Sequence, residues 1–223
     1  MPQGNINRLL VEKARSGRTV ARLKGGDPFI FGRGGEEAEA LAAEGIEFEI
    51  VPGVTSAAAV PAYAGIPLTH RKIASSFAVV TGHENPAKGE SGIEWDVVAR
   101  MGTVVFLMGV TNLAENMKKL VEFGMSPDTP AAVISRGTYP SQASVTGTVA
   151  DIAGKAAARE DIGSPAIVVT GGVVRFSDVI SWYEKKPLFG KRIVVTRPRE
   201  QARPLSSLFE EMGAEVVEFP AIE

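Results

Sequence analysis

The sequence contains no cysteine, although it is 223 residues long. Without cysteine the chain cannot form disulfides, present a thiolate nucleophile or bind a metal through sulfur. Histidine is scarce as well, since two imidazoles are too few for a convincing metal cluster. We therefore predict no metal site.

An excess of charge of one sign and long apolar runs are also missing. The 24 basic and 26 acidic residues give a formal net charge of −2, and no basic stretch stands out, which argues against a nucleic-acid partner. No apolar run approaches the roughly 18 residues that a membrane span needs, and the N-terminus has no basic-then-apolar signal segment. We therefore expect a soluble cytoplasmic protein that binds neither membranes nor nucleic acids.

Segments of helical and of strand character alternate along the chain. This alternation predicts an α/β fold with a largely parallel sheet, and the closely spaced strands after about Pro130 predict a mixed second sheet. The 44% hydrophobic content suffices for more than one compact unit. We expect helices at 6–15, 36–44, 55–64, 112–122 and 149–159, and strands at 19–23, 47–51, 77–81, 104–107, 131–135, 144–148 and 166–170.

The string Arg22-Leu-Lys-Gly-Gly-Asp-Pro-Phe-Ile-Phe-Gly-Arg-Gly-Gly-Glu-Glu37 is the strongest sign of a binding site. It lies between an expected strand and an expected helix, and open α/β sheets bind their ligands at the carboxyl ends of strands. Gly25 and Gly26 leave backbone amides uncovered, and Asp27 offers a carboxylate to ligand hydroxyl or ammonium groups. Gly-Gly-Asp-Pro alone also fits a plain turn, but a plain turn does not need the phenylalanines, glycines and arginine that follow.

Three motifs together carry a resemblance to a known family. The string above, Gly65-Ile-Pro-Leu-Thr-His-Arg71 and Phe106-Leu-Met-Gly109 resemble the uroporphyrinogen-III C-methyltransferases of the tetrapyrrole methylase superfamily, from about Pro2 to about Lys185. The resemblance implies a two-domain fold, with a parallel-sheet domain, a mixed-sheet domain and the cofactor in the cleft between them. It implies S-adenosylmethionine as cofactor, a tetrapyrrole substrate and a homodimer.

The resemblance also assigns residues to the cofactor and to the substrate. Thr55 and Ser56 begin a helix, where amides and hydroxyls suit a carboxylate, although simple capping explains them too. Met108 could contact the adenine or the sulfonium, with core packing as the alternative, and Gly137 has an ordinary turn as its alternative. The predicted cofactor residues are Gly25, Gly26, Asp27, Ile30, Thr55, Ser56, Met108 and Gly137, and the predicted substrate residues are Arg22 and Arg33.

The implied reaction is C-methylation of uroporphyrinogen III to precorrin-2, on the way to siroheme or cobalamin. Methyl transfer needs alignment of donor and acceptor more than a strong nucleophilic side chain, and the arginine fork suits the carboxylates of the substrate. A proton must leave the attacked carbon, but we assign no catalytic residue to that step. We expect His70 and His83 to be structural, and Arg71 to be a solvated charge.

We expect the sequence to be a piece of a longer, bifunctional protein. Family members begin with a G-x-G-P-G-D segment that is missing here, and 190–223 resembles the opening of uroporphyrinogen-III synthase. We therefore expect the isolated chain to be inactive. The predicted domains are an incomplete methylase subdomain at 1–84, a second subdomain at 85–184, a linker at 185–190 and an incomplete synthase-like domain at 191–223.

Two alternatives remain open. A related methylase could act on a later corrin precursor, on a modified histidine of a translation factor or on ribosomal RNA, although the motifs resemble the uroporphyrinogen subgroup more closely. A non-catalytic module of the nicotinamide-binding type would need G-x-G-x-x-G after its first strand, and Gly32-Arg-Gly-Gly35 does not have that spacing.

Overall fold

The computed structural model describes residues 1–83 and 91–221. The chain forms two compact units, Met1–Ser56 and Ala57–Glu223, which are described separately below. The predicted boundary between residues 84 and 85 lies outside the described residues, and the predicted domain bounds stay a prediction. No helix in the described ranges is long and apolar enough to cross a bilayer.

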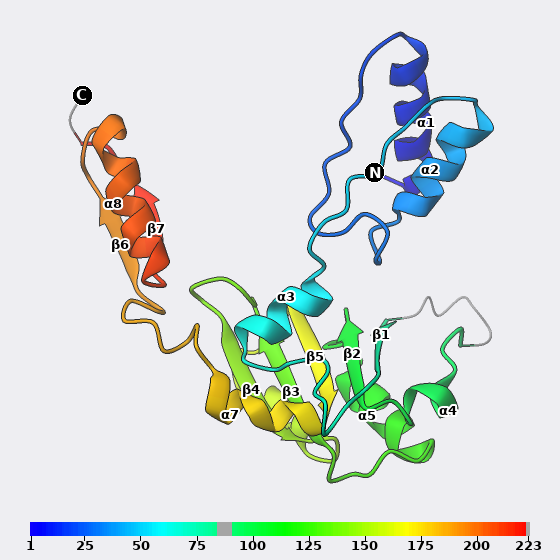
Figure 1. The fold of residues 1–223 in the computed structure, drawn as a ribbon, viewed down its shortest axis with the longest axis vertical. Helices are drawn as coiled ribbons and strands as arrows, with labels where there is room; N and C mark the ends of the chain where they lie inside the picture. Colours follow the sequence, from blue (N-terminus) through cyan, green and yellow to red (C-terminus); the bar gives the residue numbers. More distant parts are fainter. Residues whose placement is uncertain (84–90, 222–223) are drawn as a thin grey trace. The chain divides into compact units, whose positions relative to one another are not determined.

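The first unit is built on two helices, α1 (Gln3–Arg15) and α2 (Gly34–Ala43), which lie side by side (Figure 1). The Asn7 side chain of α1 donates a hydrogen bond to the backbone carbonyl of Glu36 at 3.1 Å. Both helices were predicted, and each starts two or three residues earlier than expected.

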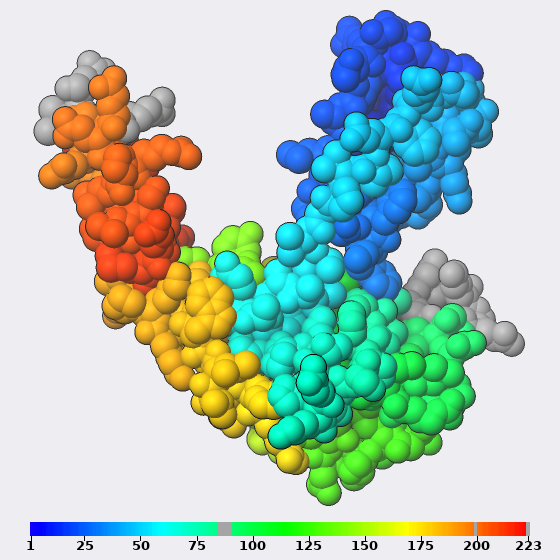
Figure 2. All heavy atoms as spheres, in the orientation of Figure 1, coloured from blue at the N-terminus to red at the C-terminus, as the bar shows by residue number. Residues whose placement is uncertain are grey.

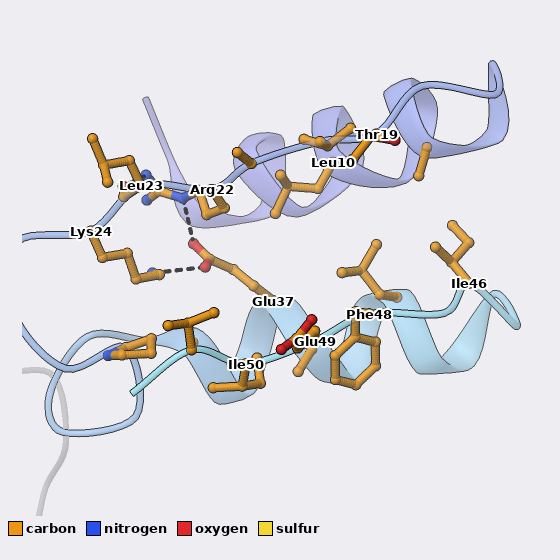
Figure 3. Close-up of a pocket in the computed structure, with 18 of the residues that line it drawn as sticks. Leu10, Thr19, Arg22, Leu23, Lys24, Glu37, Ile46, Phe48, Glu49 and Ile50 are labelled. Atoms are coloured by element: carbon orange, nitrogen blue, oxygen red, sulfur yellow. Dashed lines mark hydrogen bonds and ion pairs between the residues drawn. The ribbon is translucent and has the colours of Figure 1, made fainter. Parts of the chain in front are cut away.

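The strands predicted at 19–23 and 47–51 are wrong. Both segments run as extended chain beside the helices, but neither is paired in a sheet with any other part of the described chain (Figure 3). Strand assignment requires a hydrogen-bonded neighbour, and a β-branched sequence pattern does not reveal whether one is present. Side chains at the ends of these segments are exposed, with Leu23 88% and Val51 72% accessible.

The second unit contains a five-stranded mixed sheet in the order β1-β2-β5-β3-β4. Its strands are β1 (Phe77–Thr81), β2 (Thr103–Leu107), β3 (Pro130–Ser135), β4 (Ala143–Thr148) and β5 (Ala166–Gly171). β1 runs parallel to β2, whereas β5 is antiparallel to both β2 and β3. The carboxyl ends of β1, β2 and β3 therefore meet at one edge of the sheet. The strands predicted at 77–81, 104–107, 131–135, 144–148 and 166–170 are confirmed, and so is the mixed sheet.

Helices cover both faces of this sheet. One core contains Phe106 together with residues of α4 (Trp95–Val98), α5 (Leu113–Glu122) and α6 (Ile152–Ala157). The other core contains Val105 together with residues of α3 (Ser56–Tyr63) and the 3₁₀ helix η1 (Gly172–Phe176). Successive side chains of a strand point to opposite faces, so burial on both faces explains why these strands read as continuous apolar runs.

The second unit ends in a strand–helix–strand segment. β6 (Arg192–Val195) pairs in parallel with β7 (Glu215–Glu218), and α8 (Arg199–Glu211) connects them. The short α7 (Ser177–Ile180) precedes the linker. Figure 2 shows the outer surface of the sheet-containing part, coloured cyan to yellow.

Candidate functional site

A hollow of about 880 Å³ lies in the first unit. Its walls are the two extended segments, 18–24 and 46–53, together with apolar side chains of α1 and α2 such as Leu10 and Leu41 (Figure 3). Arg22, Lys24 and Glu37 belong to this lining and point toward one another. The start of the predicted cofactor loop therefore borders the hollow.

Asp27 braces that loop with both of its carboxylate oxygens. Oδ1 accepts a hydrogen bond from the Phe29 amide at 2.8 Å, and Oδ2 accepts one from the Gly53 amide at 3.0 Å. These hydrogen bonds, that of Gly53 first, hold the pKa of the Asp27 carboxyl below its usual range. The carboxylate thus joins the glycine-rich loop to the end of the extended segment 46–53. Its predicted contact with ligand hydroxyl or ammonium groups stays a prediction.

The backbone around Asp27 is open on one side and crowded on the other. A Cβ atom on Gly25 would meet nothing within 4 Å, so a ligand can approach the backbone there. A Cβ atom on Gly53, in contrast, would collide with the Gly26 carbonyl oxygen. Ile30 lies further along the loop with an exposed side chain. The loop therefore combines an uncovered backbone with an accessible apolar side chain.

Glu37 forms a charged cluster beneath the loop. Its carboxylate is 4% exposed and contacts Lys24 Nζ at 2.7 Å and Arg22 Nε at 3.2 Å. The Gln3 side-chain amide donates to it at 3.0 Å. Burial acts to raise the pKa of Glu37, but the hydrogen bonds from Lys24, Gln3 and Arg22 outweigh it and the pKa is lowered. The sequence indicated Glu37 only as an acidic residue in the first turn of a helix.

The two predicted substrate arginines lie at opposite ends of the loop. Arg22 donates to Glu37 and to the Leu23 carbonyl, and its side chain is 41% exposed. Arg33 adopts a left-handed backbone conformation, with φ of 57°, and donates to both carboxylate oxygens of Glu36 at 2.8 Å. Both guanidinium groups are accessible but already hydrogen-bonded to neighbouring acids. Their contact with a substrate stays a prediction.

In the second unit, Met108 and Gly137 follow β2 and β3 at the same edge of the sheet. Met108 is 55% exposed and has φ of 58°, so it is not core filler. The residues on either side of Gly137, Arg136 and Thr138, also have positive φ values of 46° and 74°. Each such conformation costs about 1–2 kcal/mol for a residue with a side chain. Clusters of strained residues occur at functional sites.

Side chains that the sequence analysis did not single out support this strained turn. The Gln142 side-chain carbonyl accepts from the Thr138 amide at 2.9 Å, and the Tyr183 hydroxyl donates to the Thr138 carbonyl at 3.0 Å. Gln142 in turn donates to the Glu184 carboxylate at 2.8 Å. No sequence motif indicated these long-range contacts, because Gln142, Tyr183 and Glu184 lie outside the glycine-rich strings.

The predicted residues thus fall into two groups. In the first unit, Arg22 and Gly26 line the hollow, and Ser56 is the exposed first residue of α3. Met108 and Gly137 share an edge in the second unit. The described residues contain no group of three His, Asp or Glu side chains placed to hold a metal ion.

Comparison with known proteins gives consistent matches. A family profile described as "Tetrapyrrole (Corrin/Porphyrin) Methylases" matches residues 1–153. An S-adenosyl-L-methionine-dependent uroporphyrinogen III methyltransferase of Methanosarcina barkeri is 55% identical over 181 residues, which cover 81% of this chain and 71% of that protein. A uroporphyrinogen-III C-methyltransferase of Bacillus subtilis is 48% identical over 221 residues, which cover 99% of this chain but 45% of that protein.

A solved structure matches as well. The uroporphyrin-III C-methyl transferase of Thermus thermophilus, complexed with S-adenyl homocysteine, superimposes with a TM-score of 0.66 at 38% identity. The match covers 78% of this chain and 74% of that one. The chain therefore spans about three quarters of this relative and less than half of the Bacillus protein.

Proposed function

The chain belongs to the tetrapyrrole methylase family, and on that premise we propose that it is the methyltransferase part of an enzyme that methylates uroporphyrinogen III with S-adenosylmethionine, giving precorrin-2. The observation that carries the proposal is the 55% identity to a methyltransferase of this specificity over 71% of its length. A relative named siroheme synthase, 54% identical over 176 residues, supports siroheme biosynthesis as the pathway.

The residues of the glycine-rich loop fit the cofactor. Open space at Gly25 lets a ribose or a carboxylate reach the backbone, and the exposed Ile30 gives an apolar contact. We assign Gly25, Gly26, Asp27 and Ile30 to the cofactor, together with Thr55, Ser56, Met108 and Gly137. When bound, S-adenosylmethionine supplies an electrophilic methyl group.

The protein's part in the reaction is to bind and to orient. Uroporphyrinogen III carries carboxylates on its rim, and the guanidinium groups of Arg22 and Arg33 can donate hydrogen bonds to them. Alignment of a pyrrole carbon with the methyl group lets the new carbon–carbon bond form as the sulfur–methyl bond breaks. The proton then released from that carbon needs a base or a water path, and we assign no residue of this chain to it.

Further features of the whole protein belong to the proposal. A homodimer in the cytoplasm is expected from the family resemblance, and cobalamin synthesis is a second destination of the product. Bifunctionality is supported by the Bacillus relative, which contains almost the whole of this chain in less than half of its length. The unit β6–α8–β7 would then begin the synthase part.

Binding and turnover test this function. Calorimetry should detect S-adenosylhomocysteine but not NAD, and the complete protein should methylate uroporphyrinogen III. Methylation of a later corrin precursor, with uroporphyrinogen III left unchanged, would keep the family but reject the substrate. Binding of NAD in place of S-adenosylhomocysteine would reject the function.

A further inference from the structure

Among the residues whose burial the structure describes, Glu37 is the one charged residue in the interior. Its neighbour Glu36 sits in the same first turn of α2 but is exposed, with a carboxylate paired to Arg33. Either acid can interact with the positive end of the helix. Helix stabilisation therefore does not explain why Glu37 is buried, and burial of a charge is costly unless it is paired.

Lys24 is the first partner of Glu37, and it has a second contact. Its ammonium lies 2.7 Å from Glu37 Oε2 and also donates to the Gly32 carbonyl at 2.5 Å. Lys24 immediately precedes the glycine-rich loop and Gly32 lies near its end. One ammonium group, 12% exposed, therefore closes the base of the loop and ties it to α2 (Figure 3).

Arg22 is the second partner. Its Nε donates to Glu37 Oε1 at 3.2 Å and its Nη1 donates to the Leu23 carbonyl at 3.0 Å. No group of the described residues accepts a hydrogen bond from its Nη2. A guanidinium fixed through Nε and Nη1 presents Nη2 in one orientation, which is what a carboxylate ligand requires.

We propose that Glu37 is a positioning residue, which holds Lys24 across the base of the glycine-rich loop and fixes the guanidinium of Arg22. It touches neither cofactor nor substrate. This inference rests on the proposed function for the identity of the ligands, but the contacts that carry it lie within the first unit. Order imposed on the loop before binding lowers the entropy cost of binding.

A matched pair of isosteric variants tests this role. Glu37→Gln removes the buried charge, and Glu36→Gln removes the neighbouring exposed charge from the same helical turn. We expect Glu37→Gln to weaken S-adenosylhomocysteine affinity by about tenfold or more and to raise the KM for uroporphyrinogen III in the complete protein. Glu36→Gln should leave the S-adenosylhomocysteine affinity within about twofold, because exposed ion pairs contribute little. Equal effects of the two variants would overturn the proposal.

Hydrogen exchange without ligand separates this proposal from the proposed function. The amides of Phe29 and Gly34, which donate to Asp27 Oδ1 and to the Pro28 carbonyl, should exchange faster in Glu37→Gln than in the unchanged chain, and Glu36→Gln should leave them unaltered. If the chain bound no S-adenosylhomocysteine, the proposed function would fail, and exchange in the loop would still decide whether Glu37 holds it. Unaltered exchange in Glu37→Gln would overturn the inference alone.

A double variant distinguishes the cluster from general destabilisation. Lys24→Met leaves Glu37 with Arg22 and Gln3, and Lys24→Met combined with Glu37→Gln removes both charges. If the two side chains act as one unit, the double variant should bind S-adenosylhomocysteine about as well as Glu37→Gln alone. Additive losses would show that they act separately and would overturn the inference. Glu37→Asp, which keeps the charge, should restore part of the affinity.

Discussion

At the scale of single residues, Asp27 is the side chain that holds the glycine-rich loop in place. Asp27 was selected because a carboxylate after two glycines suits a ligand. The structure shows that both of its oxygens accept backbone hydrogen bonds, one from Phe29 and one from Gly53. The contact to Gly53 joins positions that are far apart in the sequence, and no local pattern reports such a contact.

We predict that Asp27→Asn weakens S-adenosylhomocysteine binding. An amide keeps one acceptor oxygen and replaces the other with a donor that repels the Gly53 amide, so one side of the brace is lost. Calorimetry on the two proteins should show a loss of about tenfold. Wild-type affinity in the variant would mean that the brace does not prepare the loop for its ligand.

The pH dependence of that difference follows from the lowered pKa of Asp27. A carboxyl with a depressed pKa in the folded protein keeps its stabilising effect above its ordinary pKa of about 3.9 and loses it as the pH falls through the folded value. The affinity gap between the wild type and Asp27→Asn should therefore be constant from pH 8 to about pH 5. A gap that closes near pH 6 would point to a different group.

Gly137 illustrates how one residue can have two explanations. The resemblance assigns it to the cofactor, and the structure shows that a Cβ there would collide with the side chain of Val60 in α3. Close packing alone is a sufficient reason for glycine at this position. Both explanations can hold together, but close packing predicts that a variant loses stability, whereas a cofactor contact predicts that it loses affinity.

We predict that Gly137→Ala destabilises the protein by about 1–3 kcal/mol, because α3 must shift to admit the methyl group. Gly154→Ala in α6 is the matched control, since nothing lies within 4 Å of its Cβ position, and it should stabilise by roughly 0.5–1 kcal/mol. Urea unfolding measures both. If Val60→Ala restores the stability of Gly137→Ala but not its cofactor affinity, Gly137 also contributes to binding.

At the scale of elements, prediction succeeded where a segment has hydrogen-bonded neighbours and failed where it has none. β2 lies between β1 and β5, and all of its residues are buried. The segments 19–23 and 47–51 have similar β-branched composition, yet the hollow in the first unit separates them. The short helices α4 and α7 were missed because four residues are too few to show a helical period.

We predict that the amides of 19–23 and 47–51 exchange with solvent much faster than those of β2 and β5. Unpaired backbone groups open at almost no cost, whereas exchange in a buried central strand requires wider unfolding. Hydrogen exchange followed by mass spectrometry resolves these segments. Equal protection in 19–23 and in β2 would show that the extended segments have hydrogen-bonded partners in solution.

At the scale of the whole molecule, the fold class could be predicted and the relation between the parts could not. The order of strands and helices sufficed for an α/β fold with a mixed second sheet, because each element has a pattern of its own. The predicted cofactor residues, however, are distributed over two compact units, Met1–Ser56 and Ala57–Glu223. Periodicity within an element contains no information on which residues, far apart in the sequence, bind the same ligand.

The strand–helix–strand unit allows a test of independence at this scale. β6 and β7 pair only with each other among the described residues, and α8 packs on them. The link to the preceding chain includes a hydrogen bond from the Leu188 amide to the Met212 carbonyl at 3.0 Å. Because β6 and β7 pair only with each other among the described residues, the five-stranded sheet has no strand in common with this strand–helix–strand segment.

We predict that a chain ending at residue 189 keeps the thermal midpoint of the sheet and the same affinity for S-adenosylhomocysteine, because no predicted cofactor residue lies beyond Gly137. The isolated segment 190–223 should be unfolded, since segments below about 40 residues rarely bury enough apolar surface to fold alone. Circular dichroism of both fragments and calorimetry of the longer one make the comparison. A lower thermal midpoint or a weaker S-adenosylhomocysteine affinity in the shortened chain would show that the strand–helix–strand segment stabilises the methylase part. The two parts would then form one cooperative structure.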